Sequence, residues 1–324
     1  MLDIKFIREN PDAVQDSCQN RGYQIDISGL LELDKKWREL KGQDDELRAE
    51  RNKISENINQ AKKAKDEKAA KEFIRKAKEI PEKLAKNEQE EKVLREKIDH
   101  VLSNIPNIQK NDVPVGGEEM NKVIHSKGKI PKIKNPKSHL ELGKNLDLIE
   151  IERATKISGA GFYLLKGKAA KLQRALVQFM LDFHVKNGFT EINPPQLVNR
   201  NSAFGTGNLP KFDDQLYKTN DNLILIPTAE VPITNIYSGE TLNEKDLPKK
   251  FCAFTECYRT EVGRKAGEEG LFRLHQFEKV EMIYICTPKD SWKMHEEMTG
   301  YAEKILESLE LPYRRVLLAT GDAG

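Results

Sequence analysis

The chain has little of what marks disulfide-bonded, zinc-binding or membrane proteins. Its 324 residues include only four cysteines, and no two of them form a Cys-x-x-Cys pair. This spacing indicates neither a structural zinc site nor a disulfide framework, and free thiols in a reducing compartment are the expected state. No apolar run is long enough to cross a membrane, and no secretory signal opens the chain. We therefore expect a soluble cytoplasmic protein.

A strong excess of one charge is also missing. There are 54 Lys and Arg residues against 52 Asp and Glu, so the formal net charge is +2. Any nucleic-acid binding must therefore come from local basic patches rather than from the overall field. Charged residues still make up 33% of the chain, which predicts a long solvated element. The length allows two domains and a sizeable core.

The segment from about residue 30 to residue 100 is rich in Lys, Glu, Arg, Asp, Ala and Leu. Its apolar residues recur at alternating steps of four and three, which is the spacing of a coiled-coil seam. Two series predict an antiparallel helical hairpin, on the order of 45 Å long at 1.5 Å per residue. The series are Leu33, Trp37, Leu40, Leu47, Ile54 and Ile58, with Asp44 and Arg51 in the gaps, and Phe73, Ala77, Ile80, Leu84, Leu94, Ile98, Val101 and Ile105, with Asn87 and Glu91 in the gaps.

Two features of this arm leave alternatives open. Pro81 falls inside the second helix and predicts either a kink there or a break before it. The lysine-rich turn between the helices is either a solvated helix end, the commoner reason for such runs, or a surface for sequence-independent phosphate contact. The lysines of this turn are Lys62, Lys63, Lys65, Lys68 and Lys71.

Residues 251–286 form two strand-like runs joined by a loop of Gly and charged residues. The runs, 251–262 and 271–286, predict an antiparallel hairpin. Alternate residues of a strand share a face, and the residues grouped in this way are Arg259 and Glu261 in the first run and Arg273, His275, Phe277, Lys279 and Glu281 in the second. An arginine fork suits phosphate, a ring face suits a base, and a carboxylate suits an ammonium or hydroxyl. The face is either a solvated charged surface or a site for a nucleotide and a small amine-bearing substrate.

Two further segments precede this hairpin. Residues 168–187 predict an amphipathic helix capped by Gly188, with an apolar face of Leu172, Leu176, Phe179, Met180 and Phe183. A short apolar strand over residues 222–226 leads into Thr228-Ala229-Glu230. This tripeptide is typical of a helix N-terminus with Thr as the cap, although a hydroxyl and a carboxylate at a strand end can also face a small zwitterion.

Several of these strings resemble one family. Tyr258-Arg259-Thr260-Glu261, the loop, and the string FRLHQF at 272–277 resemble motif 2 of the class II aminoacyl-tRNA synthetases, and RLHQFEKVEM is similar to the seryl-tRNA synthetases. The helix at 168–187, the strand after it and Pro195 resemble motif 1, which forms the homodimer interface of that class. The long helical hairpin resembles the arm with which seryl enzymes contact tRNA. The features occur in the family's order and span essentially the whole chain.

The resemblance implies an α+β protein with two domains. Residues 1–110 would form a tRNA-binding domain with the long helical arm. Residues 111–324 would form a class II catalytic core, in which helices flank an antiparallel β-sheet. The implied activity is activation of L-serine with ATP to seryl-adenylate and transfer to tRNA(Ser), with Mg²⁺ as the accompanying ion. A cytoplasmic homodimer is implied, and tRNA(Sec) is left open as a second acceptor.

The resemblance also implies residue roles. Arg259 would hold the α-phosphate as the catalytic residue, Thr260 and Glu261 would complete this side of the ATP site, Arg273 would bind the outer phosphates, and Phe277 would stack on adenine. The implied serine-binding residues are Thr228, Ala229, Glu230, Arg259 and Glu281. The implied tRNA contacts are Lys62, Lys63, Lys65 and Lys68. No metal ligand is expected within the chain.

The sequence departs from the family's pattern at one place. The glycine-rich third motif of class II synthetases, with its ATP-binding arginine, is not found before Gly324. We therefore expect a C-terminally incomplete core that is impaired in catalysis as it stands. The alternative is a non-catalytic, synthetase-derived protein that binds tRNA through its arm. A purely structural coiled-coil protein would leave residues 150–286 unexplained.

Overall fold

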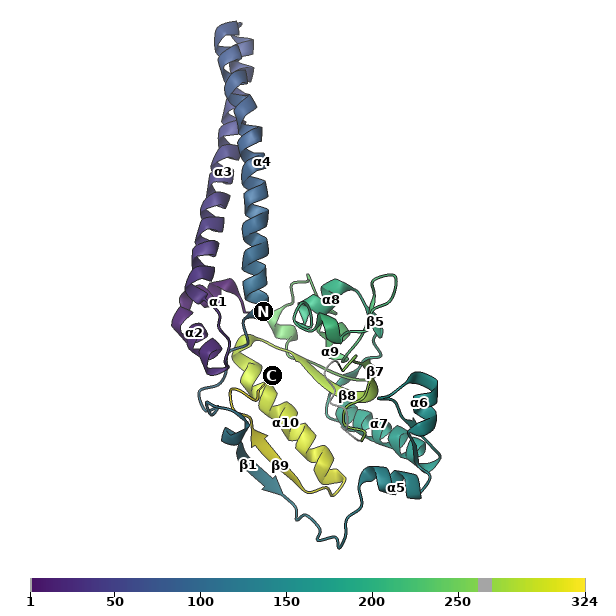
Figure 1. Ribbon diagram of the computed structural model, residues 1–324. Helices are drawn as coiled ribbons and strands as arrows, with labels where there is room; N and C mark the ends of the chain where they lie inside the picture. The colour runs from purple at the N-terminus through teal and green to yellow at the C-terminus, as the bar shows by residue number, and fades with distance from the viewer. Residues whose placement is uncertain (1, 262–269, 324) are drawn as a thin grey trace. The chain divides into compact units, whose positions relative to one another are not determined.

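The computed structural model describes residues 2–261 and 270–323, and the chain divides into two compact units (Figure 1). The first unit comprises Met1–Lys122 and Val316–Gly324, and the second comprises Val123–Arg315. The first unit therefore extends past the boundary expected at residue 110 and includes the last residues of the chain. Each unit has its own hydrophobic clusters.

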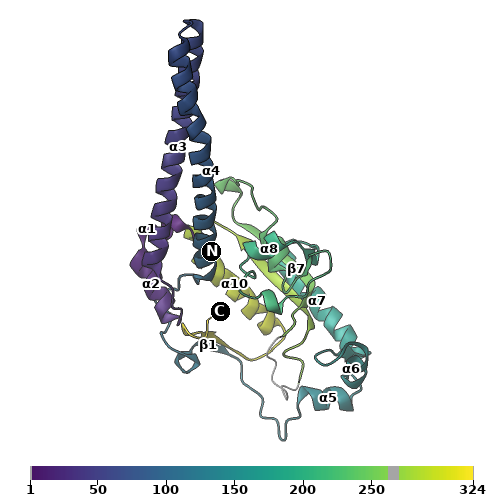
Figure 2. The same ribbon diagram turned by 45° about the horizontal axis from the view of Figure 1, so that its top comes forward.

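The first unit is built on a helical hairpin of α3 (Ile27–Lys63) and α4 (Glu67–Asn104), which lie side by side in Figures 1 and 2. The two helices have 37 and 38 residues, or about 55 Å each at 1.5 Å per residue. Asp26 and Asp66 cap their N-termini, because each carboxylate accepts a hydrogen bond from the backbone N–H three residues on. The predicted hairpin is confirmed and is longer than expected.

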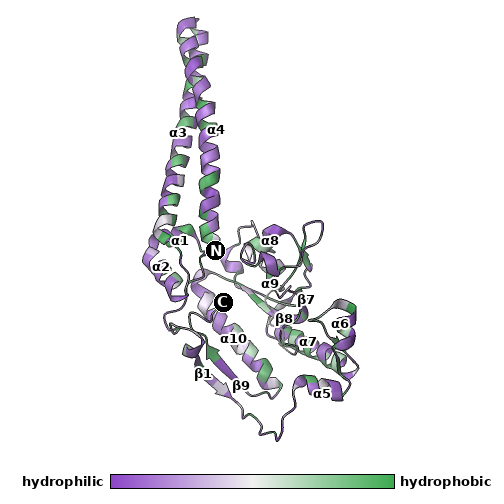
Figure 3. Cartoon of the chain, viewed as in Figure 1, coloured by the Kyte–Doolittle hydropathy of each residue, from purple (hydrophilic) through white to green (hydrophobic). Residues whose placement is uncertain are grey.

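The predicted seam holds the arm together. In its distal half, Ile54, Ile80 and Leu84 form a buried cluster with their apolar neighbours on both helices. At its base, Ile98 packs with α1 (Ile4–Glu9) and α2 (Pro11–Asn20). Figure 3 shows the arm as mostly hydrophilic, with hydrophobic residues at intervals along it. Pro81 lies inside α4, which continues unbroken, so the alternative of a break before it is wrong.

Polar seam residues meet across the two helices. Asp44 is fully buried, and its Oδ1 accepts a hydrogen bond of 2.8 Å from Nδ2 of Asn87. Nζ of Lys41 lies 2.7 Å from Oε2 of Glu91. Arg51 is the exception, since its side chain is exposed. The buried Asp44 carboxylate reaches the half-buried Asn87 amide in one alignment only, so this hydrogen bond favours a single register of the hairpin.

The second unit is organised around β7 (Lys249–Tyr258) and β8 (Gln276–Ile285), which pair antiparallel from Lys249↔Ile285 to Tyr258↔Gln276. The short strand β4 (Thr190–Glu191) joins the other edge of β7 in parallel. The predicted hairpin is confirmed, but both strands are shorter than expected. Arg259, Glu261, Arg273 and His275 lie beyond the ladder rather than on a strand face. The chain leaves the ladder because Thr260 bonds instead to the carbonyls of Asp214 and Gln215, and Glu261 takes a left-handed φ of +48°.

Helices cover both faces of this hairpin. Even-numbered strand residues such as Cys252 and Met282 pack with Leu181 of α7 (Lys168–Lys186) and with α10 (Ser291–Ser308). Odd-numbered residues such as Ala253 and Ile283 pack with α9 (Glu230–Thr234). The alternation of side chains along a strand therefore separates the residues on which α7 packs from the residues that face α9.

Helix α7 ends as predicted, since Gly188 follows it with a φ of +85°. Its burial differs from the prediction, because the side chains that it buries are Leu181 and His184. Of the expected apolar face, Leu172 remains 59% exposed and the others are half-buried. The sheet is narrow and contacts only one side of the helix, so the second apolar side stays partly open.

The remaining elements are short and connect these parts. The helices are α5 (His139–Asn145), α6 (Glu152–Ser158) and α8 (Arg200–Gly205), with 3₁₀ turns at Glu118–Met120, Asp213–Gln215, Glu244–Asp246 and Pro288–Asp290. The strands are β1 (Lys122–Lys127), β2 (Ile149–Glu150), β3 (Leu164–Leu165), β5 (Leu197–Val198), β6 (Ile224–Leu225) and β9 (Tyr313–Leu317). Within the described ranges, no helix has the length and apolar character needed to cross a membrane.

The buried pair of the arm gives a first prediction. Replacing Asn87 by Leu removes the amide donor of Asp44 and leaves a buried carboxylate oxygen unbonded, which costs about 1–3 kcal/mol. Thermal unfolding followed by circular dichroism should show a lower midpoint for Asn87→Leu. The double variant Asp44→Leu/Asn87→Leu should recover the loss, and the exposed control Gln89→Leu should match the wild type. An unchanged midpoint in Asn87→Leu would show that the pair does not stabilise the arm.

Candidate active site

A closed set of polar contacts lies on the α9 side of β8. The hydroxyl of Thr228 donates to Oε2 of Glu281 at 2.6 Å. Nζ of Lys279 donates to Oε1 of Glu281 at 2.9 Å and to Oγ1 of Thr228 at 2.8 Å. The backbone N–H of Glu230 donates to Oε2 of Glu281 at 3.1 Å. A carboxylate, a hydroxyl and an ammonium therefore share one small region.

Local structure explains how these groups meet. Lys279 and Glu281 are two residues apart on β8 and so share a face. The tripeptide 228–230 connects β6 to α9, and Ala229 rather than Thr228 occupies the N-cap position of this helix. The helix begins at Glu230, whose N–H donates to Oγ1 of Thr228 at 3.2 Å, while the same hydroxyl reaches Glu281. Ala229, which was expected to bind serine, is fully buried and presents no surface to a ligand in this structure.

The electrostatics of this pocket favour a cation. Desolvation raises the pKa of Glu230, and the negative charge of Glu281 raises it further, while Lys279 acts in the opposite direction. The Glu230 side chain is crowded by protein atoms and yet remains open to solvent. Two carboxylates with one resident ammonium suit a ligand that carries a second ammonium and a hydroxyl.

The expected nucleotide residues lie at the adjoining end of the hairpin, in two pairs. The guanidinium of Arg259 lies over the ring of Phe277, with its carbon 5.1 Å from the ring centroid. Nε of Arg273 lies 4.0 Å from Oε2 of Glu261. The two chain ends are tied together, since the N–H of Arg259 donates to the carbonyl of His275 at 2.9 Å. Four residues expected to bind ATP are therefore brought together, although three of them lie beyond the strands.

Thr260 is placed differently from its neighbours. Its hydroxyl donates to the carbonyl of Asp214 at 2.8 Å, and its N–H donates to the carbonyl of Gln215 at 3.1 Å. The side chain therefore anchors the end of β7. Of the motif 2 loop, residues 262–269 lie outside the described residues.

Sequence reasoning gave no role to Lys279, although it placed the residue on the correct face. Its spacing of two from Glu281 was the available signal, but the bond to Thr228 joins residues 51 positions apart and has no local signature. The anchoring carbonyls of Asp214 and Gln215 were missed for the same reason. The expected tRNA contacts lie on the arm, at and beside the turn between α3 and α4. Their side chains are all exposed: Lys62, Lys63, Lys65, Lys68 and Lys71.

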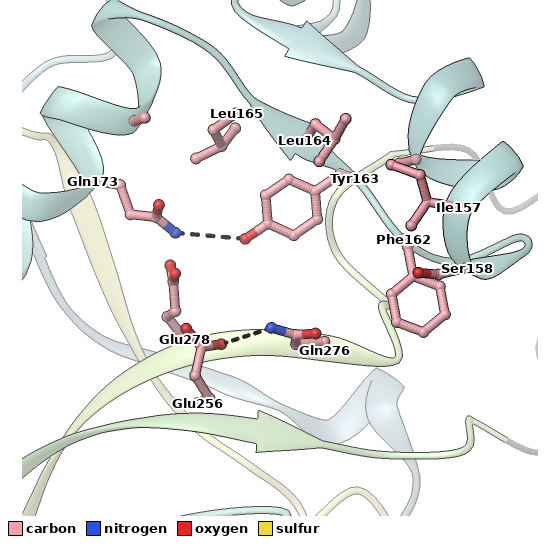
Figure 4. Close-up of a pocket in the computed structure, with 12 residues that line it drawn as sticks. Ile157, Ser158, Phe162, Tyr163, Leu164, Leu165, Gln173, Glu256, Gln276 and Glu278 are labelled. Atoms are coloured by element: carbon pink, nitrogen blue, oxygen red, sulfur yellow. Dashed lines mark hydrogen bonds between the residues drawn. The ribbon is translucent and has the colours of Figure 1, made fainter.

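A cavity of about 320 Å³ lies on the opposite face of the hairpin (Figure 4). Glu256 and Glu278 face each other there across the two strands. Nε2 of Gln276 donates to Oε2 of Glu256 at 3.2 Å, and Nε2 of Gln173 donates to the Tyr163 hydroxyl at 3.5 Å. Desolvation and the neighbouring Glu256 carboxylate raise the pKa of Glu278 to about 7.

This carboxyl pair makes stability depend on pH. The folded state keeps the Glu278 proton at pH values where the unfolded chain has lost it, so the contribution of Glu278 to stability is full below about pH 4.5 and is lost as the pH rises through about 7. Glu278→Gln should remove this dependence and raise stability at pH 8 by on the order of 1 kcal/mol, because partial solvation screens the repulsion. Urea unfolding at pH 5 and pH 8 measures the effect. The exposed control Glu240→Gln should behave as the wild type, and a parallel pH dependence in Glu278→Gln would contradict the assignment.

Two protein-family models match the chain. The seryl-tRNA synthetase N-terminal domain matches residues 1–109, and the tRNA synthetase class II core domain (G, H, P, S and T) matches residues 211–324. Among curated relatives, the serine–tRNA ligase of Trichlorobacter lovleyi is 44% identical over 329 residues, and that of Brucella canis is 43% identical over 334 residues. Each alignment covers all of this chain and 77% of the relative.

Solved structures agree with this result. The seryl-tRNA synthetase of Pyrococcus horikoshii, complexed with ATP, is similar with a TM-score of 0.88 and 36% identity, over all of this chain and 78% of that one. The cytoplasmic serine–tRNA ligase of Naegleria fowleri, in complex with AMP, is similar with a TM-score of 0.83 and 28% identity, over all of this chain and 79% of that one. The domain models, the curated relatives and the solved structures agree, and the chain belongs to the seryl-tRNA synthetase family of class II aminoacyl-tRNA synthetases.

Proposed function

We propose that two adjoining parts of this site bind the two small substrates of the family, serine and ATP. The enzyme activates L-serine with ATP and charges tRNA with the seryl group. The polar pocket around Glu281 binds serine, and the end of the hairpin around Arg259 binds ATP. The observation that carries this division is that Phe277, Lys279 and Glu281 follow one another on a single face of β8, with Arg259 over Phe277.

Serine has an ammonium and a hydroxyl, and the pocket offers acceptors for both. The ammonium binds the carboxylates of Glu281 and Glu230, and the hydroxyl bonds within the same set through Thr228. In this structure Lys279 donates hydrogen bonds to Thr228 and Glu281. The ammonium of an entering serine competes with Lys279 for these two acceptors. Alanine lacks the hydroxyl and would leave buried polar groups unpaired, so the pocket rejects it.

The nucleotide half places ATP next to the serine carboxylate. Adenine stacks on Phe277, and its amino edge meets Glu261. The side of the base that bears the ribose meets the backbone of Thr260. Arg259 covers the ring of Phe277 in this structure, so ATP binding moves its guanidinium from the ring to the α-phosphate. Arg273 then binds the outer phosphates as a bidentate donor.

The chemistry needs positioning and charge stabilisation but no covalent enzyme intermediate. An oxygen of the serine carboxylate attacks the α-phosphorus of ATP, the bond from that phosphorus to the oxygen that bridges to the β-phosphate breaks, and pyrophosphate leaves. Arg259 stabilises the negative charge that grows on the α-phosphate oxygens. The terminal ribose hydroxyl of tRNA then attacks the carbonyl carbon of seryl-adenylate, and AMP leaves with the bonding electrons.

Mg²⁺ is proposed as the counter-ion that accompanies the phosphates of ATP. Among residues 2–261 and 270–323, no three His, Cys, Asp or Glu side chains converge in a metal-binding group. These residues therefore do not fit a dedicated protein site for the ion, and we derive no step through it.

The proposed partners follow from two surfaces. The exposed lysines of the arm contact the phosphates of tRNA(Ser), and tRNA(Sec) is left open as a second acceptor. The partly open apolar side of α7, with Leu172 59% exposed, supports a homodimer through the motif 1 region near Pro195. The setting for this reaction is the cytoplasm.

Arg259→Ala tests the catalytic assignment. Loss of the guanidinium should lower serine-dependent exchange of pyrophosphate into ATP about 100- to 1,000-fold, as expected for a donor aimed at transition-state charge. The exchange is measured on this chain and, in parallel, on a version extended past Gly324 with sequence of the T. lovleyi relative. Arg75→Ala on the arm is the matched control and should keep full exchange. Near-normal exchange in Arg259→Ala would refute the role, and tRNA binding without exchange in either parent would favour a non-catalytic relative.

The arm gives a separate prediction. Replacing Lys62, Lys63, Lys65 and Lys68 by Ala should weaken tRNA(Ser) binding and flatten its dependence on salt, by roughly 0.7–0.9 in log–log slope for each phosphate that the arm no longer neutralises. Fluorescence anisotropy across a salt series measures both quantities. The matched control replaces Lys129, Lys132, Lys134 and Lys137, which are exposed in a different segment. Equal slopes for the arm variant and the wild type would remove these lysines from the tRNA interface.

A further inference from the structure

The segment that leads into β8 is held by a histidine from far away in the sequence. The backbone N–H of Leu271 donates to Nε2 of His139 at 3.1 Å, across 132 positions of sequence. The next side chain, Phe272, meets the same imidazole edge-to-face, with ring centroids 4.9 Å apart and an interplanar angle of 74°. One ring therefore makes a polar and an aromatic contact with two consecutive residues.

The preceding residue is shaped for this contact. Gly270 has a φ of +123°, and a Cβ built on it would lie 2.8 Å from Nε2 and 2.9 Å from Cε1 of His139. Such distances are shorter than van der Waals contact, so the imidazole can approach this closely only because the residue is glycine. The amide of Leu271, the ring of Phe272 and the Cα of Gly270 therefore all lie against His139, although the Phe272 ring is otherwise exposed.

His139 is itself held firmly. It is the first residue of α5, whose N-terminus is capped by Ser138, since Oγ accepts from the N–H of Glu141 at 3.1 Å. The helix rests closely on β2, because a Cβ added to Gly143 would lie 2.5 Å from Cδ1 of Ile149. The imidazole is therefore presented by an element that does not belong to the hairpin.

A second tether lies four residues further on. The N–H of His275 donates to the carbonyl of Gly161 at 3.1 Å, and its Nδ1 lies 3.1 Å from the carbonyl oxygen of Arg259. Arg273 lies between the tethers at residues 271 and 275, with its Nε 4.0 Å from Oε2 of Glu261. Because the backbone is fixed on both sides, the direction in which Arg273 leaves it is fixed as well.

We propose that His139 is a positioning residue for ATP: its imidazole holds the backbone at Leu271 and thereby aims Arg273 at the outer phosphates. His139 touches no substrate. The inference rests on the role of Arg273 in the proposed function and adds the element that orients it.

The experiment compares His139→Leu, His139→Gln and Arg273→Ala by calorimetric titration with ATP and, separately, with serine. Loss of one backbone hydrogen bond should weaken ATP binding about 3- to 10-fold in His139→Leu and leave serine binding unchanged. The Gln side chain offers an amide oxygen as acceptor and should restore most of the affinity. Hydrogen exchange of the peptide at 270–276 should speed up in His139→Leu and not in His139→Gln.

Two further variants keep the result interpretable. Gly270→Ala should push the imidazole away from the other side and weaken ATP binding in the same way, while the exposed His295→Leu should match the wild type. If His139→Leu keeps full ATP affinity while Arg273→Ala loses it, or if serine binding falls together with ATP binding, the positioning role is refuted. If Arg273→Ala keeps full ATP affinity, the phosphate role of Arg273 fails and the inference falls with it.

Discussion

The antiparallel ladder of β7 and β8 is the constraint on which the rest of the catalytic unit depends. Its register sets Ala253 opposite Glu281 and Glu256 opposite Glu278. Because side chains alternate, a slip of one residue in either strand would exchange the faces of that whole strand. Glu281 would then point at α7, and apolar side chains such as Met282 would face Thr228 and α9. The same ladder that buries the core thus decides which charges can meet a substrate.

Charges on the site face are balanced by one another before any substrate arrives. Lys279 rests on Thr228 and Glu281, and Arg259 rests on Phe277. In the proposed function, these are the groups that serine and ATP would engage, so binding would exchange internal contacts for substrate contacts. Such a site needs little reorganisation of its backbone, and that is the condition for electrostatic catalysis to be effective.

Local patterns predicted the elements well. The heptad steps through Ile54 and Leu84 predicted the arm, Gly188 predicted the end of α7, and two β-rich runs predicted the hairpin. What the sequence did not reveal depends on contacts between distant residues. The ladder ends at Tyr258 because the next residue but one, Thr260, donates hydrogen bonds to carbonyls more than forty residues earlier in the chain. Which side of α7 is buried depends on the width of the sheet on which the helix packs. No periodicity records either fact.

This distinction also separates the two halves of the site. In the proposed function, the serine half lies on the ladder and on the turn that packs against it, so its geometry follows from strand alternation. Apart from Phe277, which is paired within the ladder, the proposed nucleotide half lies beyond it, where backbone tethers at Thr260, Leu271 and His275 replace strand pairing. Substitutions at those tethers should therefore affect ATP more than serine, while substitutions that shift the ladder should affect both. Separate dissociation constants for the two substrates are consequently the measurement that distinguishes a residue that orients the nucleotide from one that only supports the fold.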